Sequence, residues 1–414
     1  MTLRVWHDGR DVGLLSANER SLRFAYADAW RSDAQAFALS PRLPMTSPEH
    51  EGDEVLHFFA NLLPEGPVLD TLCRLRRLPR GDVFRLLASF GREGAGAFDV
   101  LAEDESPDQA FGHVPYDADM IRADLAEMRR DVPLLHRHGE LRLSLAGAQN
   151  KLPVALIDGR LHLPVGAAAS THILKPALPG AYAHSVENEA VCMRLAAAVG
   201  IPTASVQIWK DPEPMLLVER YDRVVSAERV TRLHQLDFCQ LAGVLPDQKY
   251  ESDGGPGFAS LFALVDAHAT LPARDRLQLV DWLVFNFLIG NADAHGKNAS
   301  MRHDRDGRLR LAPVYDLLST SFWPSLSPKM AMGIGGEKRP DWVMARHWQR
   351  LCTATAINLA QLRRRALALT EAAATALPEV AAVLGIDATS AIVKHLRDSI
   401  ERRGGWIDER MTHA

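Results

Sequence analysis

A polar cluster directly follows a long apolar segment in the C-terminal half of the chain. Residues 279–289, LVDWLVFNFLI, read as a buried helix, and residues 290–300, GNADAHGKNAS, come next. Asp293 and Asn298 lie five positions apart, as do the base Asp and the metal-binding Asn of protein-kinase catalytic loops. Phosphoryl transfer needs a carboxylate to orient the attacking hydroxyl and oxygen ligands to hold Mg²⁺. We therefore predict Asp293 as the catalytic base and Asn298 as a metal ligand.

A second metal carboxylate is expected at Asp316, within LRLAPVYDLLS (residues 309–319). This segment reads as a short apolar strand, and a charge between apolar residues needs a partner, which Mg²⁺ would supply. Tyr315-Asp316-Leu317 stands where kinases carry Asp-Phe-Gly. Another interpretation remains open: Asp293 and Asn298 shape an Asx-rich loop, and Asp316 caps a helix that begins at Leu317.

Two further residues of the cluster call for a role. Lys297 is the second catalytic candidate, because an ammonium immediately before Asn298 could neutralise the transferred phosphate in the transition state. His295 lies close to Asp293, and a lone histidine beside a carboxylate more often orients that side chain than binds metal. We therefore expect a structural or orienting role for His295.

A nucleotide-binding lysine is expected at Lys175, at the end of the apolar strand THILK. Kinases hold such a lysine with a helix carboxylate, here Glu189 in ENEAVCMRLAAA, although Glu187 is placed equally well by sequence. An ordinary strand end with a solvated lysine head is the alternative.

Other contacts to the nucleotide are expected from two segments. The loop in LSLAGAQNKLPVAL offers Ser144, Gly147, Ala148 and Gln149 between two strands, where small residues let backbone N–H groups approach phosphate. The apolar strand of LLVERYDR ends just before the helical part of the chain. Its backbone from Glu219 to Tyr221 would meet the adenine edge.

The elements that must position these residues follow a recognisable order. Residues 1 to about 45 alternate apolar and polar residues between turn signals, which predicts a small antiparallel sheet, and residues 55–98 have helical periodicity. The polar, proline-broken segment 104–119 marks a boundary. Strands with one inserted helix follow residue 141, and nearly everything after residue 230 is helical in pattern.

This order predicts an α+β protein with a two-lobed, protein-kinase-like fold. We expect a small β-rich N-terminal accessory domain (residues 1–110), an ATP-binding sheet lobe (135–225) and a mostly helical catalytic lobe (226–414).

Composition limits the classes of function. The chain has 414 residues, of which 47% are apolar and 24% charged, and its net charge of −5 provides no basic field for a dedicated DNA-binding protein. Four scattered cysteines (Cys73, Cys192, Cys239 and Cys352) suit reduced core positions rather than disulfides or a zinc cluster. The N-terminus does not resemble a signal peptide, and the apolar runs are shorter than a membrane span. We expect a cytoplasmic protein without membrane contact.

The motifs together resemble the HipA-type serine/threonine kinases, toxins of bacterial type II toxin-antitoxin systems. The matching pieces, in family order, are SLAGAQNKLPVAL, HILKP, NEAVCMRLAAAVGI, LLVERYDR, LHQLDFCQLAGVLPDQKYESDGGPG, NFLIGNADAHGKNAS and LAPVYDLLS. The segments VWHDGRDVGLL, ALSPRLP and FFANLLPEG look like the accessory domain of these kinases. The resemblance runs from about residue 3 to about residue 375.

The resemblance implies ATP and Mg²⁺ as cofactors and transfer to serine. It maps the same roles onto Lys175, Asp293, Asn298 and Asp316, and it implies that Ser144 is an inactivating autophosphorylation site. It also implies a small helix-turn-helix antitoxin as partner, with operator DNA reached only indirectly. Translation components such as aminoacyl-tRNA synthetases are implied as protein substrates.

Two other functions remain open from sequence. One is a catalytically weak binding module that acts with a DNA-binding antitoxin as a repressor, and the other is a small-molecule or lipid kinase. Retention of Lys175, Asp293, Asn298 and Asp316 together argues against the binding module, because a pure scaffold has no chemical need for all four.

Overall fold

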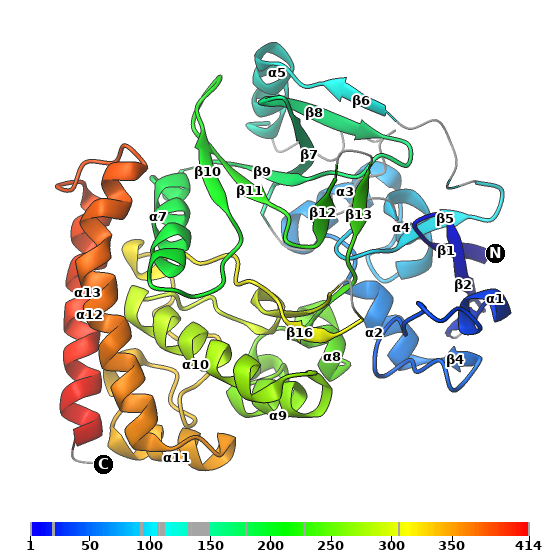
Figure 1. Cartoon of the computed structure of the whole chain (residues 1–414). Coiled ribbons are helices and arrows are strands. Elements are labelled where there is room, and N and C mark those ends of the chain that lie inside the picture. The colour runs from blue at the N-terminus through cyan, green and yellow to red at the C-terminus, as the bar shows by residue number, and fades with distance from the viewer. Residues whose placement is uncertain are drawn as a thin grey trace.

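The structure, a computed structural model, describes residues 2–18, 21–91, 94–105, 107, 112–130, 134, 149–178, 180–226, 229–304 and 307–412. Figure 1 shows three parts: N-terminal strands (blue) at one side, a second sheet (cyan to green) at the top, and helices (lime to red) below and at the opposite side. This is the predicted mixture of a β-rich N-terminal unit, a sheet lobe and a helical lobe.

The N-terminal unit is built on a five-stranded antiparallel sheet of order β4-β3-β2-β1-β5. Its strands are β1 (Thr2–His7), β2 (Arg10–Ala17), β3 (Leu22–Tyr26), β4 (Glu49–Glu51) and β5 (Asp99–Ala102), and its helices are α1 (Asp28–Arg31), α2 (Asp53–Ala60), α3 (Gly66–Arg76) and α4 (Val83–Phe90). Alternate residues of β1, including Leu3 and Val5, are buried, as period-two patterning requires. The predicted sheet and the helices after residue 55 are both present.

The second sheet has six strands in the order β10-β11-β9-β7-β8-β6. The strands are β6 (Gly112–Pro115), β7 (Leu152–Ile157), β8 (Arg160–Val165), β9 (His172–Pro176), β10 (Val206–Trp209) and β11 (Met215–Glu219), with α5 (Ala118–Met128) and α7 (Ser185–Ala198). Helix α7 is the predicted inserted helix and packs on β10 and β11. Strand β6 lies inside the segment that we expected to be a boundary and pairs with β8, so the hydrogen-bonded sheet begins before residue 135.

The C-terminal lobe is mostly helical, as predicted, but it also contains short strands. Its α-helices are α8 (Phe238–Ala242), α9 (Phe258–His268), α10 (Pro272–Ile289), α11 (Ala345–Thr355), α12 (Leu359–Val383) and α13 (Ala391–Thr412). Its 3₁₀ turns are η2 (Pro246–Gln248), η3 (Glu251–Asp253), η4 (Gly296–Asn298), η5 (Thr320–Phe322) and η6 (Pro340–Trp342). Strands β12 (Arg223–Val225) and β13 (Val230–Arg232) pair, and β14 (Gln235–Asp237), β15 (Ser300–His303) and β16 (Leu309–Leu311) form a three-stranded sheet.

The core of the helical lobe forms around α10, whose side chains from Leu279 to Ile289 are all buried. Helix α12 packs against α7, α10 and α13. Among the described residues α12 alone is long and apolar enough to cross a membrane, a test that core helices of soluble proteins also pass. The four cysteines are free and buried, as expected.

Candidate active site

A cavity of about 310 Å³ lies where the three parts of the molecule meet. The predicted site residues that line it are Gln149, Lys175, Glu189, Glu219, Tyr221, Asp293, Lys297, Asn298 and Asp316. The N-terminal unit adds Asn61 and Glu65, which sequence reasoning did not anticipate. Ser144, Gly147 and Ala148 lie outside the described residues, so their predicted roles stay predictions.

The predicted catalytic loop starts where α10 ends. Gly290 closes the helix in the left-handed conformation (φ 74°), which glycine adopts without a steric cost. Asn291 then accepts a hydrogen bond from the Asp293 N–H through its Oδ1 at 3.0 Å. The chain leaves the core here because the last carbonyls of a buried helix and the turn that follows need polar partners. The polar cluster supplies them and aims Asp293 at the cavity.

Asp293 and Asn298 are joined by one direct hydrogen bond. The Asn298 Nδ2 donates to the Asp293 backbone oxygen at 2.9 Å, which binds one end of the loop to the other. The Asp293 carboxylate accepts a bond of 2.7 Å from the Tyr250 hydroxyl. Burial, reinforced by the Asp293 charge, raises the pKa of Tyr250, so this hydroxyl keeps its proton and can only donate to the carboxylate.

His295 supports the loop from inside. Its ring lies edge-on to Tyr250 at 5.2 Å, and its Nδ1 accepts from the Lys297 N–H at 3.3 Å. Burial lowers the pKa of His295 to about 4, although the nearby Asp293 charge acts in the opposite direction. A neutral His295 that caps the η4 turn agrees with the structural role that we expected.

Asp316 faces the cavity from a strained backbone. Its φ is +53°, a region that non-glycine residues rarely occupy, and such strain is characteristic of functional sites. No helix begins at Leu317 in the described range 307–412, so the helix-capping interpretation of Asp316 is wrong. Strand β16 stops at Leu311, earlier than expected, and Pro313, which has no N–H, cannot continue the ladder. Hydrogen bonds of 2.8 and 3.0 Å between Val314 and the 202–204 segment hold the approach to Asp316 instead.

Lys175 joins the sheet lobe to the helical lobe. Its Nζ lies 2.7 Å from Glu189 Oε1 on α7 and also contacts the Asp316 carboxylate. The structure therefore selects Glu189 over Glu187 as the partner. Burial acts to lower the pKa of Lys175, but the Asp316 and Glu189 carboxylates outweigh it and raise that pKa above its usual value. Lys175 is thus a charged, buried residue rather than a solvated strand end.

Lys297 lines the cavity, but its ammonium is engaged by acceptors from two other elements. Its Nζ lies 2.7 Å from Asn61 Oδ1 and 2.6 Å from Asp237 Oδ2, and its side chain is buried. Burial acts to lower the pKa of Lys297, and the Asp237 and Glu65 carboxylates overcome it, so the ammonium stays charged. Because these acceptors already engage its hydrogens, the geometry favours a bridging role over contact with the transferred phosphate.

The connector between the lobes is anchored to the N-terminal unit. Buried Asp222 accepts a 2.9 Å bond from the Gly96 N–H and is paired with Arg220 at 2.8 Å. The N–H groups of Glu219 and Arg220 donate to the carbonyls of Ser205 and Thr171, at 2.8 and 2.9 Å. The N–H groups of Glu219 and Arg220 are therefore already engaged, and an adenine at this edge would bind to other backbone groups of the connector.

Comparison with known proteins identifies the family. The HipA-like C-terminal domain matches residues 143–381, and the HipA N-terminal domain matches residues 3–101. The chain belongs to the HipA family.

Its relatives agree with this placement. The "Putative kinase Y4mE" of Sinorhizobium fredii is 43% identical over 98% of both chains. The serine/threonine-protein kinase toxin HipA of Shewanella oneidensis is 31% identical over 83% of this chain and 81% of its own. The solved complex of Shewanella oneidensis HipA with HipB and operator DNA matches 99% of both chains, at 27% identity and a TM-score of 0.84. The predicted α+β, two-lobed fold is confirmed, and the HipA relatives named as kinases imply use of ATP.

Sequence reasoning also missed Lys151, which lines the cavity of this HipA-family chain, and Tyr250, which donates to Asp293. Lys151, two residues after Gln149, lines the same cavity as Lys175. Burial lowers the pKa of Lys151 to about 8, against the pull of Asp316. Tyr250 carries no motif and is 43 residues from Asp293. The one available signal was that both fall inside segments that resemble the HipA kinases.

The donor set of the HipA site suits Mg²⁺ that is held jointly with a nucleotide. Among the described residues no group of three or more His, Cys, Asp and Glu side chains could hold a metal ion. Asp316 and Asn298 offer one carboxylate and one amide oxygen to the cavity. Mg²⁺ commonly binds through one or two such oxygens together with substrate phosphates and water, so these residues fit a metal that arrives with ATP.

Proposed function

We propose that the protein is an ATP- and Mg²⁺-dependent protein serine/threonine kinase that acts as the toxin of a toxin-antitoxin pair. The observation that carries the proposal is the convergence of Asp293, Asn298, Asp316 and the Lys175–Glu189 pair on one cavity between two lobes. Fold alone does not define a reaction, but this set supplies the parts that phosphoryl transfer requires.

Each residue has a role that follows from its chemistry. Asp293, oriented by Tyr250, would align the acceptor serine hydroxyl and accept its proton. Asn298 and Asp316 would hold Mg²⁺, which neutralises charge on the phosphates when bound. Lys175, held by Glu189, would bind the phosphate oxygens, and Lys151 adds a second ammonium in the same cavity.

The loop that contains Ser144, Gly147, Ala148 and Gln149 is proposed to cover the phosphates. Ser144 would be an autophosphorylation site, as the family resemblance implies. A doubly negative group in that loop would face the ATP phosphates, and like-charge repulsion would displace the loop. This supplies a physical reason for self-inactivation.

A HipB-like, helix-turn-helix antitoxin is proposed as the partner. The Shewanella oneidensis HipA structure contains HipB and operator DNA, and it aligns with 99% of this chain. With a net charge of −5, the chain would reach operator DNA only through the antitoxin. A translation component such as an aminoacyl-tRNA synthetase is the proposed substrate, and the cytoplasm is the proposed location.

Labelled ATP tests the proposal directly. The parent protein with Mg²⁺ should incorporate label at Ser144, and Asp293→Asn should abolish incorporation. Asp266→Asn, an exposed carboxylate paired with Arg276, is the matched control and should behave like the parent. Equal labelling of Asp293→Asn and the parent would exclude Asp293 as the base.

Two further measurements address the other functions. Thermal unfolding without any stabilisation by Mg²⁺ and ATP would favour a binding module over a kinase. Phosphoproteomics after brief expression of the parent and of Asp293→Asn would identify the acceptor. Phosphorylation of small molecules alone would assign the site to a small-molecule kinase.

A further inference from the structure

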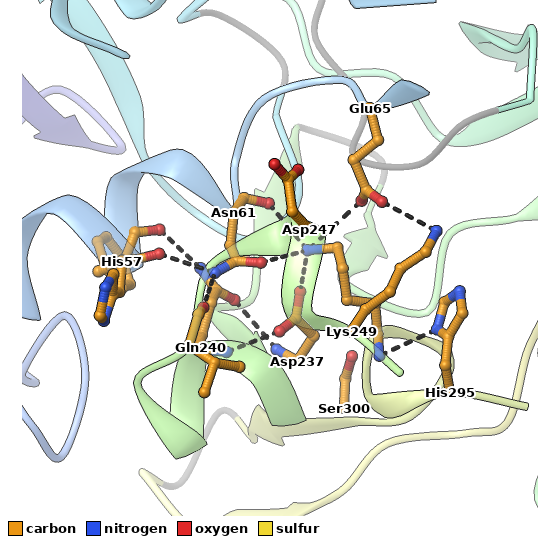
Figure 2. A network of polar contacts seen from close by, with 12 residues as sticks. His57, Asn61, Glu65, Asp237, Gln240, Asp247, Lys249, His295 and Ser300 are labelled. Carbon is orange, nitrogen blue, oxygen red and sulfur yellow. Dashed lines mark hydrogen bonds and ion pairs between the residues drawn. The ribbon is translucent and has the colours of Figure 1, made fainter. Parts of the chain in front are cut away.

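A buried polar network joins the N-terminal unit to the catalytic loop, and Figure 2 shows Asn61 and Glu65 of this unit within it. The Lys297 Nζ lies 2.7 Å from Asn61 Oδ1 and 3.3 Å from Asn61 O, and it is 3.6 Å from Glu65 Oε1. Asn61, Glu65 and Lys297 are 1%, 6% and 7% exposed. Asn61 and Glu65 come from a unit more than 200 residues earlier in the chain, so their contact with the loop is purely tertiary.

The orientation of Asn61 is fixed on its other side. Its Nδ2 donates to the backbone oxygens of His57 at 2.8 Å and Val244 at 2.9 Å. The amide must therefore present Oδ1 to Lys297. On the opposite side of the ammonium, Asp237 uses one oxygen to cap α8 and the other to accept from Lys297 at 2.6 Å. Lys297 is thus held between a preset amide of the N-terminal unit and a preset carboxylate of the helical lobe.

Glu65 reaches the loop by a second route. Its Oε2 pairs with Lys249 Nζ at 3.1 Å, and the Lys249 carbonyl accepts from the Gly296 N–H at 3.3 Å. The next residue, Tyr250, donates to Asp293. Glu65 therefore contacts both Lys249 and Lys297, and residues adjacent to these two lysines orient Asp293.

The charges of this network balance, with Lys249 and Lys297 opposite Glu65 and Asp237. Burial acts to raise the pKa of Glu65, but Lys297 and Lys249 outweigh it and hold that pKa below its usual value. Neutralising Glu65 would leave a buried positive charge without compensation, and such a charge is relieved by displacement of the groups that carry it. Those groups belong to the loop that places Asp293.

We infer that Asn61 and Glu65 are positioning residues of the catalytic loop, which makes the N-terminal unit a part of the phosphoryl-transfer site. The inference rests on the proposed kinase function. The nucleotide grip of Lys175 and Glu189 lies on the sheet lobe, outside this network. Loss of Asn61 or Glu65 should therefore reduce turnover much more than it weakens ATP binding.

The test uses the full chain with three substitutions in the N-terminal unit. Asn61→Ala removes the acceptor of Lys297, and Glu65→Gln removes the charge at nearly constant shape. Glu54→Gln on the preceding helix is the control, because Glu54 is exposed and pairs only at the surface with Arg42, at 3.0 Å. Turnover is measured with labelled ATP, affinity is measured with a non-hydrolysable ATP analogue and Mg²⁺, and thermal unfolding checks the fold.

Asn61→Ala and Glu65→Gln should lower kcat about 10- to 100-fold, the scale of small misplacements of catalytic groups. The affinity for the ATP analogue should stay within about threefold of that of the parent, because neither substitution removes a direct contact with the nucleotide. Glu54→Gln should match the parent in both. Turnover of Glu65→Gln equal to the parent, or equal losses of affinity and kcat, would overturn the inference.

A double-mutant cycle with Lys297→Met separates bridging from direct catalysis. If Lys297 acts through Asn61, the double variant Asn61→Ala/Lys297→Met should be no slower than the slower single variant. If the double variant instead loses kcat by the product of the two single losses, Lys297 acts on the phosphate independently of Asn61. That result would overturn the bridging role. Absence of any turnover in the parent protein would remove the proposed function together with this inference, whereas an active parent with active variants removes the inference alone.

Discussion

Tyr250 lies closer to the proposed chemistry than its place in the sequence suggests. Its hydroxyl is 2.7 Å from the carboxylate that would accept the substrate proton. Tyr250→Phe keeps the ring against His295 but removes the donor. A hydrogen bond to a charged group contributes about 1.5–3 kcal/mol, so kcat should fall about 10-fold or more. Steady-state kinetics would measure this, with Tyr182→Phe as the control, because the Tyr182 ring lies edge-on to Trp323 and does not line the cavity.

The Lys175–Glu189 pair leads to a second residue-level prediction. Glu189→Gln should raise the KM for ATP or lower kcat/KM about 10-fold or more, because it leaves the buried Lys175 with one carboxylate fewer. Glu187→Gln, two residues away on the same helix and only half-buried, should change kcat/KM less than twofold. ATP titrations of both variants would measure the difference. Equal effects of the two substitutions would contradict the assignment of Glu189.

Sequence could predict the residues of this site better than their partners. Asp293 and Asn298 were found because their spacing is local, and the loop fixes it within five residues. The choice between Glu187 and Glu189 required the rotation of α7, which packing decides. The acceptors of Lys297, Asn61 and Asp237, were not predicted because they are 236 and 60 positions away. Local spacing carries no information on such contacts.

At the scale of elements, the end of α10 is the most demanding junction. A Cβ on Gly290 would stand 2.2 Å from Ser321 Oγ, in addition to the left-handed φ of 74°. Gly290→Ala should destabilise the protein by about 2–4 kcal/mol, the sum of the left-handed penalty and overpacking. Gly159 in the β7–β8 turn has a similar φ of 73°, but a Cβ on it would meet no described atom within 4 Å. Gly159→Ala should therefore lower the free energy of unfolding by only about 1–2 kcal/mol.

Denaturant unfolding of both variants would measure this difference. A Gly290→Ala variant as stable as Gly159→Ala would mean that Ser321 moves aside without cost.

Element boundaries were harder to predict than element types. Strands with strict alternation, such as β1, and the continuous apolar helix α10 follow from periodicity. Strand β6 was missed because Gly112–Pro115 is short, partly exposed and ends in proline, which suits an edge strand as well as a linker. The residues just before Asp316 were predicted to be strand because apolar residues give the same sequence pattern in a turn and in a strand.

At the scale of the whole molecule, three histidines, of which His7 and His234 are buried and His303 is half-buried, lie where the N-terminal unit meets the helical lobe. His234 stacks on His303 at 5.6 Å and packs against Phe37, which also contacts His7. Burial lowers the pKa of all three, to about 4 for His303, with nearby Asp8 and Asp304 opposing it for His7 and His303. At pH values at which these histidines would be protonated in the unfolded chain, the folded protein therefore keeps them neutral.

The sign of the pH effect follows from this difference. Because the unfolded chain binds protons from about pH 6.5 downward and the folded protein does not, stability should fall as pH drops from about 6.5 toward 4. Each such histidine contributes up to about 1.4 kcal/mol per pH unit. Denaturation midpoints at several pH values would show a shallower slope for His303→Phe than for the parent protein, and equal slopes would contradict the prediction.

The contacts of the N-terminal unit have a mechanical consequence. This unit bonds to the connector, where Gly96 donates to Asp222, and to the catalytic loop, where Asn61 accepts from Lys297. The sheet lobe is coupled to the helical lobe separately, through Lys175 with Asp316 and through the packing of α7 on α12. A displacement of the N-terminal unit would therefore be transmitted to the connector and to the catalytic loop at the same time.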